Sequence, residues 1–414
     1  MTETNPSPVS VVLCGIGGYG NLHLTELLKD VDAGLCTLAG IVDPAASRAP
    51  QYEKVCARNI PIYDDLEAFY REHEAELCCI ATPIAYHTRQ TVCAMRHGSH
   101  VLCEKPLSGE WRDAALLTAL SEETGKFVMT GYQWSYNRAI LALKKDILAG
   151  KYGKPKRLKT VILWPRAQSY FRRGSGWAGT RYAPDGTKVF DSIANNAAAH
   201  YLHNMFFVTG DAPDTARRPV SVDCELFRVN PIENFDTSVI RCRFGDGTEA
   251  LFYASHTVKK ARNPRFCYEF EKGTVTYDAD APEKTIIGTL ADGTTVSYGN
   301  PYADDMEKIR IAITNVRCAP ADRNLVCTPK TAEIHAQCIE AVSRAEIVTL
   351  PETLVEKLPY GADGTDVLYT VKGLGEALDA CYDAGCMLSE GAAVPETLRS
   401  CAKLCVGIPV TDNE

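Results

Sequence analysis

A glycine-rich turn between an apolar run and a helical stretch constrains the fold of this chain more than any other feature. Residues 9–20 read VSVVLCGIGGYG, which places a G-x-G-x-x-G pattern directly after a predicted strand. Such glycines allow a tight turn, close approach of a diphosphate to the backbone and close packing of helix on strand. The pattern predicts the start of a dinucleotide-binding fold. The residues expected at the cofactor diphosphate are Gly15, Gly17, Gly18, Tyr19 and Gly20.

The second predicted strand ends in Asp43, at the spacing expected for an acid that accepts hydrogen bonds from the adenosine ribose. Its charge would repel a ribose phosphate, so NAD is expected in preference to NADP. Ser47 and Arg48 lie close enough in the sequence to soften that choice. The alternative is that Asp43 only caps a turn before Pro44.

Residues 9–130 alternate short apolar runs with amphipathic helical stretches, which is typical of parallel strands joined by crossover helices. Residues 1–130 are therefore predicted to form an α/β Rossmann domain with a doubly wound parallel sheet. The expected strands are Val9–Leu13, Leu38–Val42, Leu77–Ala81, His100–Cys103 and Phe127–Thr130. The expected helices are Asn21–Lys29, Thr88–His97 and Asp113–Thr124.

Residues 131–345 are predicted to form an α+β domain with a large open, mainly antiparallel sheet. The turn sequences at 245–247 and 292–293 mark hairpins, and Ser192–Val208 is expected to be a helix. Residues 346–414 are expected to be an extension that packs on the core, with no assigned role. A free face of the open sheet predicts self-association as a homodimer or homotetramer.

The formal net charge of -8 argues against nucleic acid or an anionic membrane as partner, since both attract clustered Lys and Arg. The N-terminus lacks the basic start and apolar run of a secretory signal, and no later run approaches a membrane span, so a cytoplasmic location is expected. The 17 cysteines are scattered through apolar stretches and are expected to be reduced. No metal site is expected, because the late cysteines lack the paired spacings of a zinc site.

Two further groups follow predicted parallel strands, where ligands bind in open α/β sheets. Thr82, Pro83 and His87 follow one strand, and Glu104-Lys105-Pro106 follows the next. With these residues the sequence resembles the Gfo/Idh/MocA family of sugar and polyol oxidoreductases, over a layout that reaches about residue 345.

The resemblance implies that Lys105 contacts the reacting hydroxyl and that Glu104 holds the cofactor ribose. It also implies that Thr82, Pro83 and His87 line the nicotinamide side of the site. The lysine assignment agrees with physical chemistry, because an ammonium beside a hydroxyl stabilises the alkoxide character that develops as hydride leaves its carbon. The alternative is a surface lysine in a proline-terminated turn.

The family's second signature is D-x-x-x-H on a helix, and the matching place here holds Asn196 and His200. On a helix these residues would be one turn apart on the same face, with His203 at the next step. His200 is expected to be the general base because its ordinary pKa lies near neutrality. Asn196 departs from the family's aspartate and removes a charge that would raise the pKa of His200. Asp191 is a candidate replacement for that charge, and the alternative is a histidine with no chemistry.

The segment before this helix, residues 165–188, combines aromatic residues with arginines. Aromatic faces suit the C–H surfaces of sugars, and guanidinium groups recognise carboxylates, so an acidic sugar or a glycoside is one possible substrate. The alternative is a solvated loop that covers the sheet. The residues expected to bind substrate are Trp164, Arg166, Trp177 and His203.

Together these features predict an NAD-dependent oxidoreductase acting on a hydroxyl carbon of a carbohydrate or polyol, with Lys105, His200 and Asn196 as catalytic residues. One alternative is a redox-assisted glycoside hydrolase of the same superfamily, which keeps and regenerates its NAD. A second alternative is a non-catalytic sensor of dinucleotide or sugar. The choice of sugar, the carbon and the direction of the reaction stay open.

Overall fold

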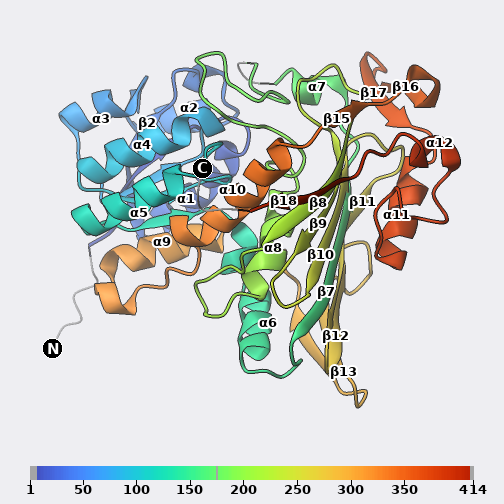
Figure 1. The fold of residues 1–414 in the computed structure, drawn as a ribbon. Helices are drawn as coiled ribbons and strands as arrows, with labels where there is room; N and C mark the ends of the chain where they lie inside the picture. The colour runs from blue at the N-terminus through green and yellow to red at the C-terminus, as the bar shows by residue number, and fades with distance from the viewer. Residues whose placement is uncertain (1–6, 174–175, 411–414) are drawn as a thin grey trace. The chain divides into compact units, whose positions relative to one another are not determined.

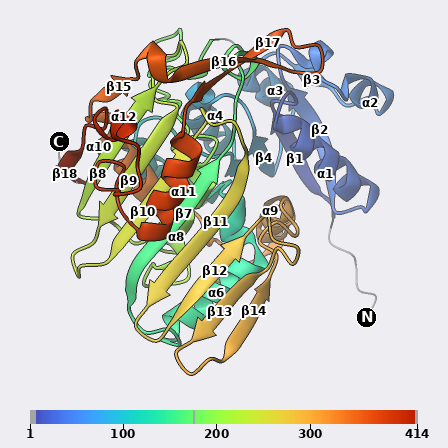
Figure 2. The same cartoon turned by 90° about the vertical axis from the view of Figure 1, so that its right-hand side faces the viewer.

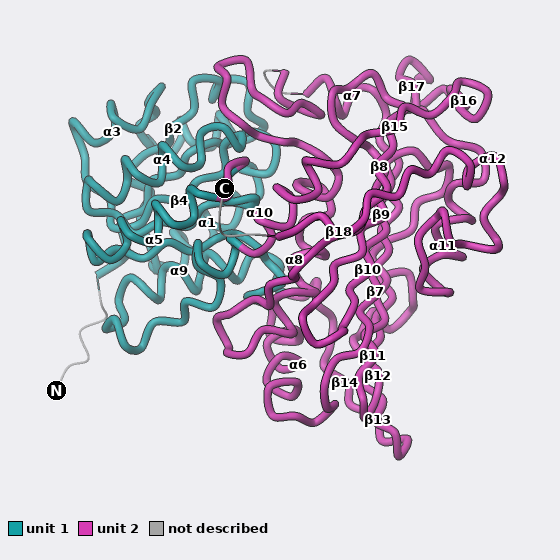
Figure 3. Tube along the Cα trace, in the orientation of Figure 1, with its two compact units in different colours: residues 1–108, 112–136, 304–333 teal, residues 109–111, 137–303, 334–414 magenta. Residues whose placement is uncertain are grey.

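The computed structural model describes residues 7–173 and 176–410 of the chain. These residues belong to two compact units, which Figure 3 colours separately. Unit 1 consists of residues 1–108, 112–136 and 304–333, and unit 2 of residues 109–111, 137–303 and 334–414. Unit 1 thus includes a late segment that the sequence placed in the second domain. The segment joins unit 1 because its helix α9 (Glu307–Arg317) packs against α1 (Gly20–Asp32) and strands of that unit.

Unit 1 is built on a six-stranded sheet in the order β3-β2-β1-β4-β5-β6, in which every neighbouring pair is parallel. Its central strands are apolar and buried throughout, because helices cover them. The order reverses between β1 and β4, which leaves a crevice at the carboxyl ends of these strands. The predicted doubly wound parallel sheet is confirmed. The strands are β1 (Val9–Cys14), β2 (Cys36–Val42), β3 (Ile62–Tyr63), β4 (Leu77–Ile80), β5 (His100–Cys103) and β6 (Val128–Thr130).

The helices of unit 1 connect these strands and pack against their sheet. They are α1, α2 (Tyr52–Ala57), α3 (Leu66–Glu72), α4 (Ile84–Arg96), α5 (Asp113–Thr124) and α9, with the short turns η1 (Ala46–Arg48) and η2 (Gln133–Tyr136). Strand β4 contacts both α4 and α9, so the centre of the sheet is shielded from solvent.

Unit 2 contains a ten-stranded sheet in the order β14-β13-β12-β11-β7-β10-β9-β8-β15, with β18 also paired to β8. Only β7 with β10 and β8 with β15 run parallel among the described pairs, so the predicted mainly antiparallel sheet is confirmed. Both predicted hairpins form, and each turn uses a glycine at positive φ, Gly247 and Gly293.

The strands of this sheet come from the middle and the end of the chain. They are β7 (Pro155–Leu163), β8 (Ser221–Arg228), β9 (Thr237–Arg243), β10 (Glu249–Ser255), β11 (Arg262–Phe270), β12 (Gly273–Asp278), β13 (Ile286–Leu290), β14 (Thr295–Gly299), β15 (Ile347–Thr349) and β18 (Cys405–Pro409). The helices are α6 (Arg138–Leu148), α7 (Gln168–Phe171), α8 (Ala199–Val208), α10 (Pro329–Ser343), α11 (Leu374–Ala384) and α12 (Glu396–Arg399). Strands β16 (Val355–Tyr360) and β17 (Asp366–Val371) pair with each other.

The helix expected over 192–208 begins only at Ala199, so the prediction for its first half is wrong. Polar side chains before the helix bind backbone groups that a helix would need. The Ser192 hydroxyl accepts from the Asn195 amide at 3.2 Å, and the Asn195 side chain donates to the carbonyls of Val189 and Phe190. These local bonds compete with helix formation. Residues 193–198 therefore form turns, and α8 itself is buried along its whole length.

The C-terminal segment covers one face of the unit 2 sheet (Figures 1 and 2). Apolar side chains of β7, β9 and β10 on this face pack in one cluster with residues 350–398, and α11 contacts β7 and β10. The Tyr253 hydroxyl donates to the carbonyls of Cys386 at 2.9 Å and Cys381 at 3.1 Å, and Arg241 pairs with Glu390. The chain itself therefore covers the part of the sheet around β7, β9 and β10 that we expected to be free for self-association.

Within the described ranges, no helix is both long and apolar enough to cross a membrane. All 17 cysteines lie in these ranges and none is in a disulfide. Most of those in the strands, such as Cys14, Cys78 and Cys242, are fully buried, as expected for core residues.

Candidate functional site

The glycine turn of unit 1 follows β1 directly and is held by backbone contacts. Gly15 has a φ of +82°, and its amide donates to the Val42 carbonyl of β2 at 2.8 Å. A Cβ atom at Gly20 would lie 2.2 Å from the Gly15 carbonyl oxygen, so only glycine allows the helix to start this close to the strand. A Cβ atom at Gly17 would meet nothing within 4 Å. Gly17 is thus open to an incoming group, which fits a diphosphate at this turn.

Asp43 closes the turn from the end of β2. Its carboxylate oxygens accept from the Ile16 amide at 2.9 Å and from the Ala45 amide at 2.8 Å. The first bond ties Asp43 to the glycine turn, and the second is the turn cap that the sequence left open as an alternative. The turn cap is therefore present, and the contact of Asp43 with the adenosine ribose stays a prediction.

Tyr19 lies in the same turn, but its hydroxyl reaches away from the glycines. It donates to the Gln133 side chain of η2 at 2.8 Å, and the Lys308 ammonium lies 5.0 Å from the centre of its ring. Tyr19 thereby links the glycine turn to η2 and α9 within unit 1.

The end of β4 is joined to the turn after β5 through His87. The His87 ring nitrogens lie 2.8 Å from the Thr82 carbonyl and 2.8 Å from the Pro106 carbonyl. Burial lowers the pKa of His87, while the two carbonyl oxygens oppose this shift because only a protonated ring can donate to both. Thr82 also lies beside the glycine turn, because a Cβ atom at Gly15 would be 3.2 Å from its methyl group. The predicted cofactor residues of unit 1 therefore meet at one edge of the sheet.

Glu104 is buried and its carboxylate is fully engaged. One oxygen lies 2.8 Å from the His23 Nε2 atom and also accepts from the Lys308 ammonium, while the other accepts from the Lys105 amide at 3.3 Å. Burial alone would raise the pKa of Glu104, but the Lys308 ammonium and the bond to His23 hold it well below its usual range. Glu104 is thus an ionised residue that fixes the Lys105 backbone, and its contact with the cofactor ribose stays a prediction.

Lys308 reaches Glu104 from helix α9. Burial would lower the pKa of the ammonium, but the Glu104 carboxylate raises it above its ordinary value, so Lys308 is charged. The ammonium also donates to the Gly131 carbonyl at 3.3 Å. A Cβ atom at Gly131 would lie 2.8 Å from the Glu104 carboxylate, so the glycine makes room for this ion pair.

In unit 2, Asn196 lies in the turns before α8 and His200 lies in the first turn of the helix. The two residues do not share a helix face, so that part of the prediction is wrong. The Asn196 side chain donates to one Asp191 carboxylate oxygen at 2.7 Å, and the other oxygen accepts from the Gly179 amide at 2.6 Å. A carboxylate is therefore held next to the position where the family has its aspartate.

His203 lies in the interior of unit 2. Only 1% of its surface is exposed, and its ring stacks on Phe207 with the ring centres 5.9 Å apart. Burial lowers the pKa of His203 well below its ordinary value, with smaller effects from His335 and Lys144. His203 is a core residue, and the expectation that it binds substrate has no support in this position.

Trp164, Arg166 and Trp177 are half-buried and lie close to one another through Tyr170 and Arg173. The Arg166 guanidinium carbon is 5.6 Å from the Trp164 ring centre, and that of Arg173 is 5.0 Å from the Trp177 ring. Trp164 in turn contacts Tyr201 with the ring centres 5.7 Å apart. The segment is therefore a packed aromatic and cationic cluster.

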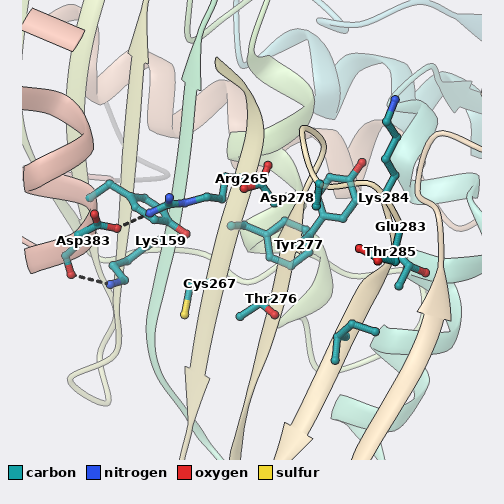
Figure 4. Close-up of a pocket in the computed structure, with 14 residues that line it drawn as sticks. Lys159, Arg265, Cys267, Thr276, Tyr277, Asp278, Glu283, Lys284, Thr285 and Asp383 are labelled. Carbon is teal, nitrogen blue, oxygen red and sulfur yellow. Dashed lines mark hydrogen bonds and ion pairs between the residues drawn. The ribbon is translucent and has the colours of Figure 1, made fainter. Parts of the chain in front are cut away.

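A separate groove of about 540 Å³ lies on the sheet face beside α11 (Figure 4). Two of its cations are paired with acids, because Arg265 pairs with the Asp383 carboxylate and Lys159 lies 3.6 Å from Glu269. The Lys159 ammonium also donates to the Asp383 carbonyl at 3.2 Å. The groove holds none of the predicted site residues.

Donor atoms of Glu67, Cys93 and His97 lie within 4.8 Å of one another on the surface of unit 1. Cys93 and His97 are one turn apart on α4 and its cap, and the His97 Nε2 atom is 3.8 Å from the Glu67 carboxylate. An ordinary surface ion pair beside a thiol accounts for this arrangement.

Comparison with known proteins identifies the nucleotide-binding part of the chain. Residues 9–132 match the family described as an oxidoreductase family with an NAD-binding Rossmann fold, Gfo/Idh/MocA. This region belongs to the Gfo/Idh/MocA family. NAD is accordingly the cofactor of this region, as Asp43 predicted.

Named relatives align with different lengths of the chain. A Comamonas testosteroni 1-carboxy-3-chloro-3,4-dihydroxycyclohexa-1,5-diene dehydrogenase is 29% identical over 147 residues, which are 36% of this chain and 36% of that protein. A Thermotoga maritima myo-inositol 2-dehydrogenase is 22% identical over 312 residues, 73% of this chain and 86% of that protein. The first of these alignments thus spans 36% of its relative's length.

A solved structure of the WlbA dehydrogenase from Bordetella pertussis, in complex with NADH and UDP-GlcNAcA, superposes with a TM-score of 0.65 at 19% identity. The match covers 81% of this chain and 96% of that chain. The two chains therefore share the fold of both units.

Two residues of unit 1, His23 and Lys308, contact Glu104 but were not expected from the sequence. His23 lies on the apolar face of α1 with Leu24 and Leu27, and a histidine on such a face indicates a buried polar contact. Lys308 gave no signal, because its partner Glu104 lies 204 residues away in the sequence. Neither position belongs to a motif.

Proposed function

We propose that this protein is an NAD-dependent oxidoreductase that transfers hydride between a hydroxyl-bearing carbon of a carbohydrate or polyol and the nicotinamide. One observation carries the proposal. A single edge of the unit 1 sheet brings together the open glycine turn, Asp43 and the turn that holds Lys105. A lysine at the cofactor edge, with its backbone fixed by a buried carboxylate, suits a reaction in which an oxygen gains negative charge.

The residues of the chain have separate roles in this proposal. NAD supplies the hydride acceptor when it is bound. The Lys105 ammonium polarises the substrate oxygen and stabilises its developing charge, and His200 accepts the hydroxyl proton. Asp191 stands in for the family's aspartate through its bond to Asn196 and keeps a negative charge close to the start of α8.

The names of the relatives support a redox reaction on a hydroxylated ring. The Comamonas and Thermotoga proteins are both named as dehydrogenases, the latter acting on myo-inositol. The WlbA structure holds NADH together with a nucleotide sugar. We further propose a cytoplasmic location, since reduced cysteines persist in that compartment.

The test is an absorbance scan at the NADH band with a panel of sugars, polyols and glycosides. Net NADH formation with at least one neutral or acidic sugar is the expected result. Glycoside cleavage with bound NAD and no net NADH would identify the redox-assisted hydrolase instead. Ligand binding without either reaction would identify a sensor. In both of these cases the proposal is wrong.

Two substitutions assign the roles. Lys105→Met is expected to reduce kcat by at least about a hundredfold with little change in NAD affinity, because the lysine acts on the substrate oxygen. Asp191→Asn preserves the size of the side chain but removes its charge, and it is expected to shift the pH–rate profile. Unchanged turnover in Lys105→Met would exclude the proposed mechanism.

A further inference from the structure

Two arginines of unit 2 lie against one tyrosine ring. The Arg173 guanidinium carbon is 3.5 Å from the centre of the Tyr170 ring, and that of Arg166 is 5.2 Å from the same centre. Each guanidinium also donates to a backbone carbonyl, Arg173 to that of Tyr170 at 2.6 Å and Arg166 to that of Pro165 at 3.2 Å. Two positive charges are therefore held at one place by local contacts.

No carboxylate of the described residues lies within 4 Å of either guanidinium, whereas other arginines of unit 2 such as Arg241 and Arg262 each face an acid. The charge of Asp191 acts on Tyr170, but its two carboxylate oxygens are taken by Asn196 and Gly179. Half-buried cations without a counterion are costly to a fold. This pair is therefore suited to an anion that binds from outside.

Aromatic side chains flank the arginines. Trp164 lies 5.6 Å from the Arg166 guanidinium carbon and Trp177 lies 5.0 Å from that of Arg173. Trp164 also contacts Tyr201, which follows His200 on α8. The cluster thus continues to the first turn of the helix that carries the proposed base, and its flat rings suit the C–H face of a sugar.

His256 does not neutralise the cluster. Its ring centre is 5.4 Å from that of Tyr170, and its Nδ1 atom lies 2.8 Å from the Trp164 carbonyl. Burial lowers the pKa of His256 to about 3. The bond to the Trp164 carbonyl opposes this shift, and the charges of Arg166 and Arg173 add to it. The imidazole is therefore neutral near pH 7 and adds no charge, so the positive charge of the cluster comes from the two guanidinium groups.

We propose that Arg166 and Arg173 bind the oxyanion of an anionic carbohydrate substrate, with Trp164 and Trp177 against the sugar ring. The planar guanidinium fork matches a carboxylate or a phosphate, which are the two sources of such an oxyanion. The inference rests on the proposed function, because only that function makes the bound anion a substrate. The anion site itself is tested by binding alone.

The experiment measures equilibrium binding to the full chain with NAD⁺ present, followed by tryptophan fluorescence and by calorimetry. The probes are D-glucuronate and D-galacturonate, D-glucose 6-phosphate and D-galactose 6-phosphate, and the neutral sugars D-glucose and D-galactose. At least one anionic probe is expected to bind at least about tenfold more tightly than its neutral counterpart. The uronate and phosphate arms distinguish the two sources of the oxyanion.

Five variants locate the effect. Arg166→Met and Arg173→Met are each expected to weaken binding of the anionic probe by about ten- to a hundredfold, without changing binding of the neutral sugar. Arg172→Met is the matched control, because that side chain is 72% exposed and lies 3.8 Å from Asp366. Arg166→Lys and Arg173→Lys keep the charge and are expected to retain part of the affinity, which separates loss of the anion contact from loss of folding.

The proposal is overturned if no anionic probe binds more tightly than its neutral counterpart, or if Arg166→Met and Arg173→Met bind it as Arg172→Met does. Failure of the proposed function looks different. Arginine-dependent binding with no NADH formed from any sugar would contradict the redox proposal and support the anion site. NADH formed from a neutral sugar, with no anionic probe bound more tightly than its neutral counterpart, would support the redox proposal and overturn the anion site.

Discussion

Glu104 and Lys308 form a buried ion pair in unit 1, in which Lys308 is fully shielded from solvent and Glu104 is only 5% exposed. The pair joins helix α9 to the turn that carries Lys105. Two charges that leave water together need each other, because either one alone would be left uncompensated in the interior. The same carboxylate contacts His23, whose pKa burial lowers, so the second partner is a neutral ring.

Lys308→Met is therefore expected to destabilise unit 1 by about 3–5 kcal/mol, because it leaves the Glu104 carboxylate buried without its partner. The double variant Glu104→Gln with Lys308→Met removes both charges and is expected to recover a large part of this loss. Denaturant titration of the single and double variants measures the difference. Arg58→Met, which breaks an exposed pair with Asp32, is the control and is expected to change stability little. A double variant that is less stable than Lys308→Met would contradict the role of the pair.

The same pair is expected to affect turnover through the Lys105 backbone. In Lys308→Met the pKa of Glu104 rises because burial then acts without the opposing ammonium. The pH–rate profile of the variant is expected to gain an inflection that the parent protein lacks, with kcat reduced more than KM is raised. A purely structural role for Lys308 would lower the amount of folded protein and leave the profile of the folded fraction unchanged.

Two glycines of the same turn are expected to respond differently to alanine. Gly20→Ala forces a Cβ atom to 2.2 Å from the Gly15 carbonyl, so it is expected to lower the melting temperature of the free protein. Gly17→Ala meets no atom within 4 Å and has no positive φ, so it is expected to fold normally and to weaken NAD binding by at least about tenfold, because the methyl group lies where the diphosphate approaches. Thermal unfolding with and without NAD⁺ measures both effects. If Gly17→Ala binds NAD⁺ like the parent protein, the diphosphate does not lie at Gly17.

The fold of unit 1 was predictable because its signals are local. The apolar runs at β1, β4 and β5, the glycine turn and Asp43 each lie within about one supersecondary unit of the sequence. Contacts between distant segments had no such signal. Helix α9 joins unit 1 through partners more than 200 residues earlier, and no periodicity in 304–333 shows which sheet it will cover.

In the candidate site, too, local features could be predicted from the sequence and contacts between distant residues could not. Sequence motifs predicted the turns at the edge of the unit 1 sheet. The start of α8 was predicted too early, because the side chains of Ser192 and Asn195 bind backbone groups that would otherwise be used in a helix. His203 matched a helical spacing to His200, but periodicity does not tell an outward face from an inward one on a helix that is buried all round. The contact of Asp191 with Asn196 depends on the turns and became visible only with them.

Acid is expected to destabilise the chain before its carboxylates are protonated. Burial lowers the pKa of five histidines in the two units, and they are His23, His87, His100, His203 and His256. In the unfolded chain these rings take up protons as the pH falls below about 6.5, while in the folded chain they stay neutral. The unfolded state then binds more protons, so stability present above pH 6.5 is lost on acidification.

Between pH 7.5 and 5.5 the expected loss is roughly 1 kcal/mol per buried histidine. Asp236 and Asp305 act in the opposite direction, because burial raises the pKa of each to about 6 and the folded state therefore gains protons in this range. Urea titrations at the two pH values measure the balance. Higher stability at pH 5.5 than at pH 7.5 would contradict the neutral state of these rings in the folded protein.

The covered sheet face is expected to take no part in self-association of the full chain. The apolar side chains that β7, β9 and β10 present to this side already pack against residues 350–398, and the Arg241 pair with Glu390 and the bonds of Tyr253 hold the cover in place. Light scattering over a hundredfold range of concentration is expected to give the mass of one chain. Leu378→Asp puts a charge under α11, loosens the cover and is expected to raise the mass through exposed apolar surface. A parent protein that forms dimers with hydrogen-exchange protection gained at α11 would show that this face, with its cover, is the interface.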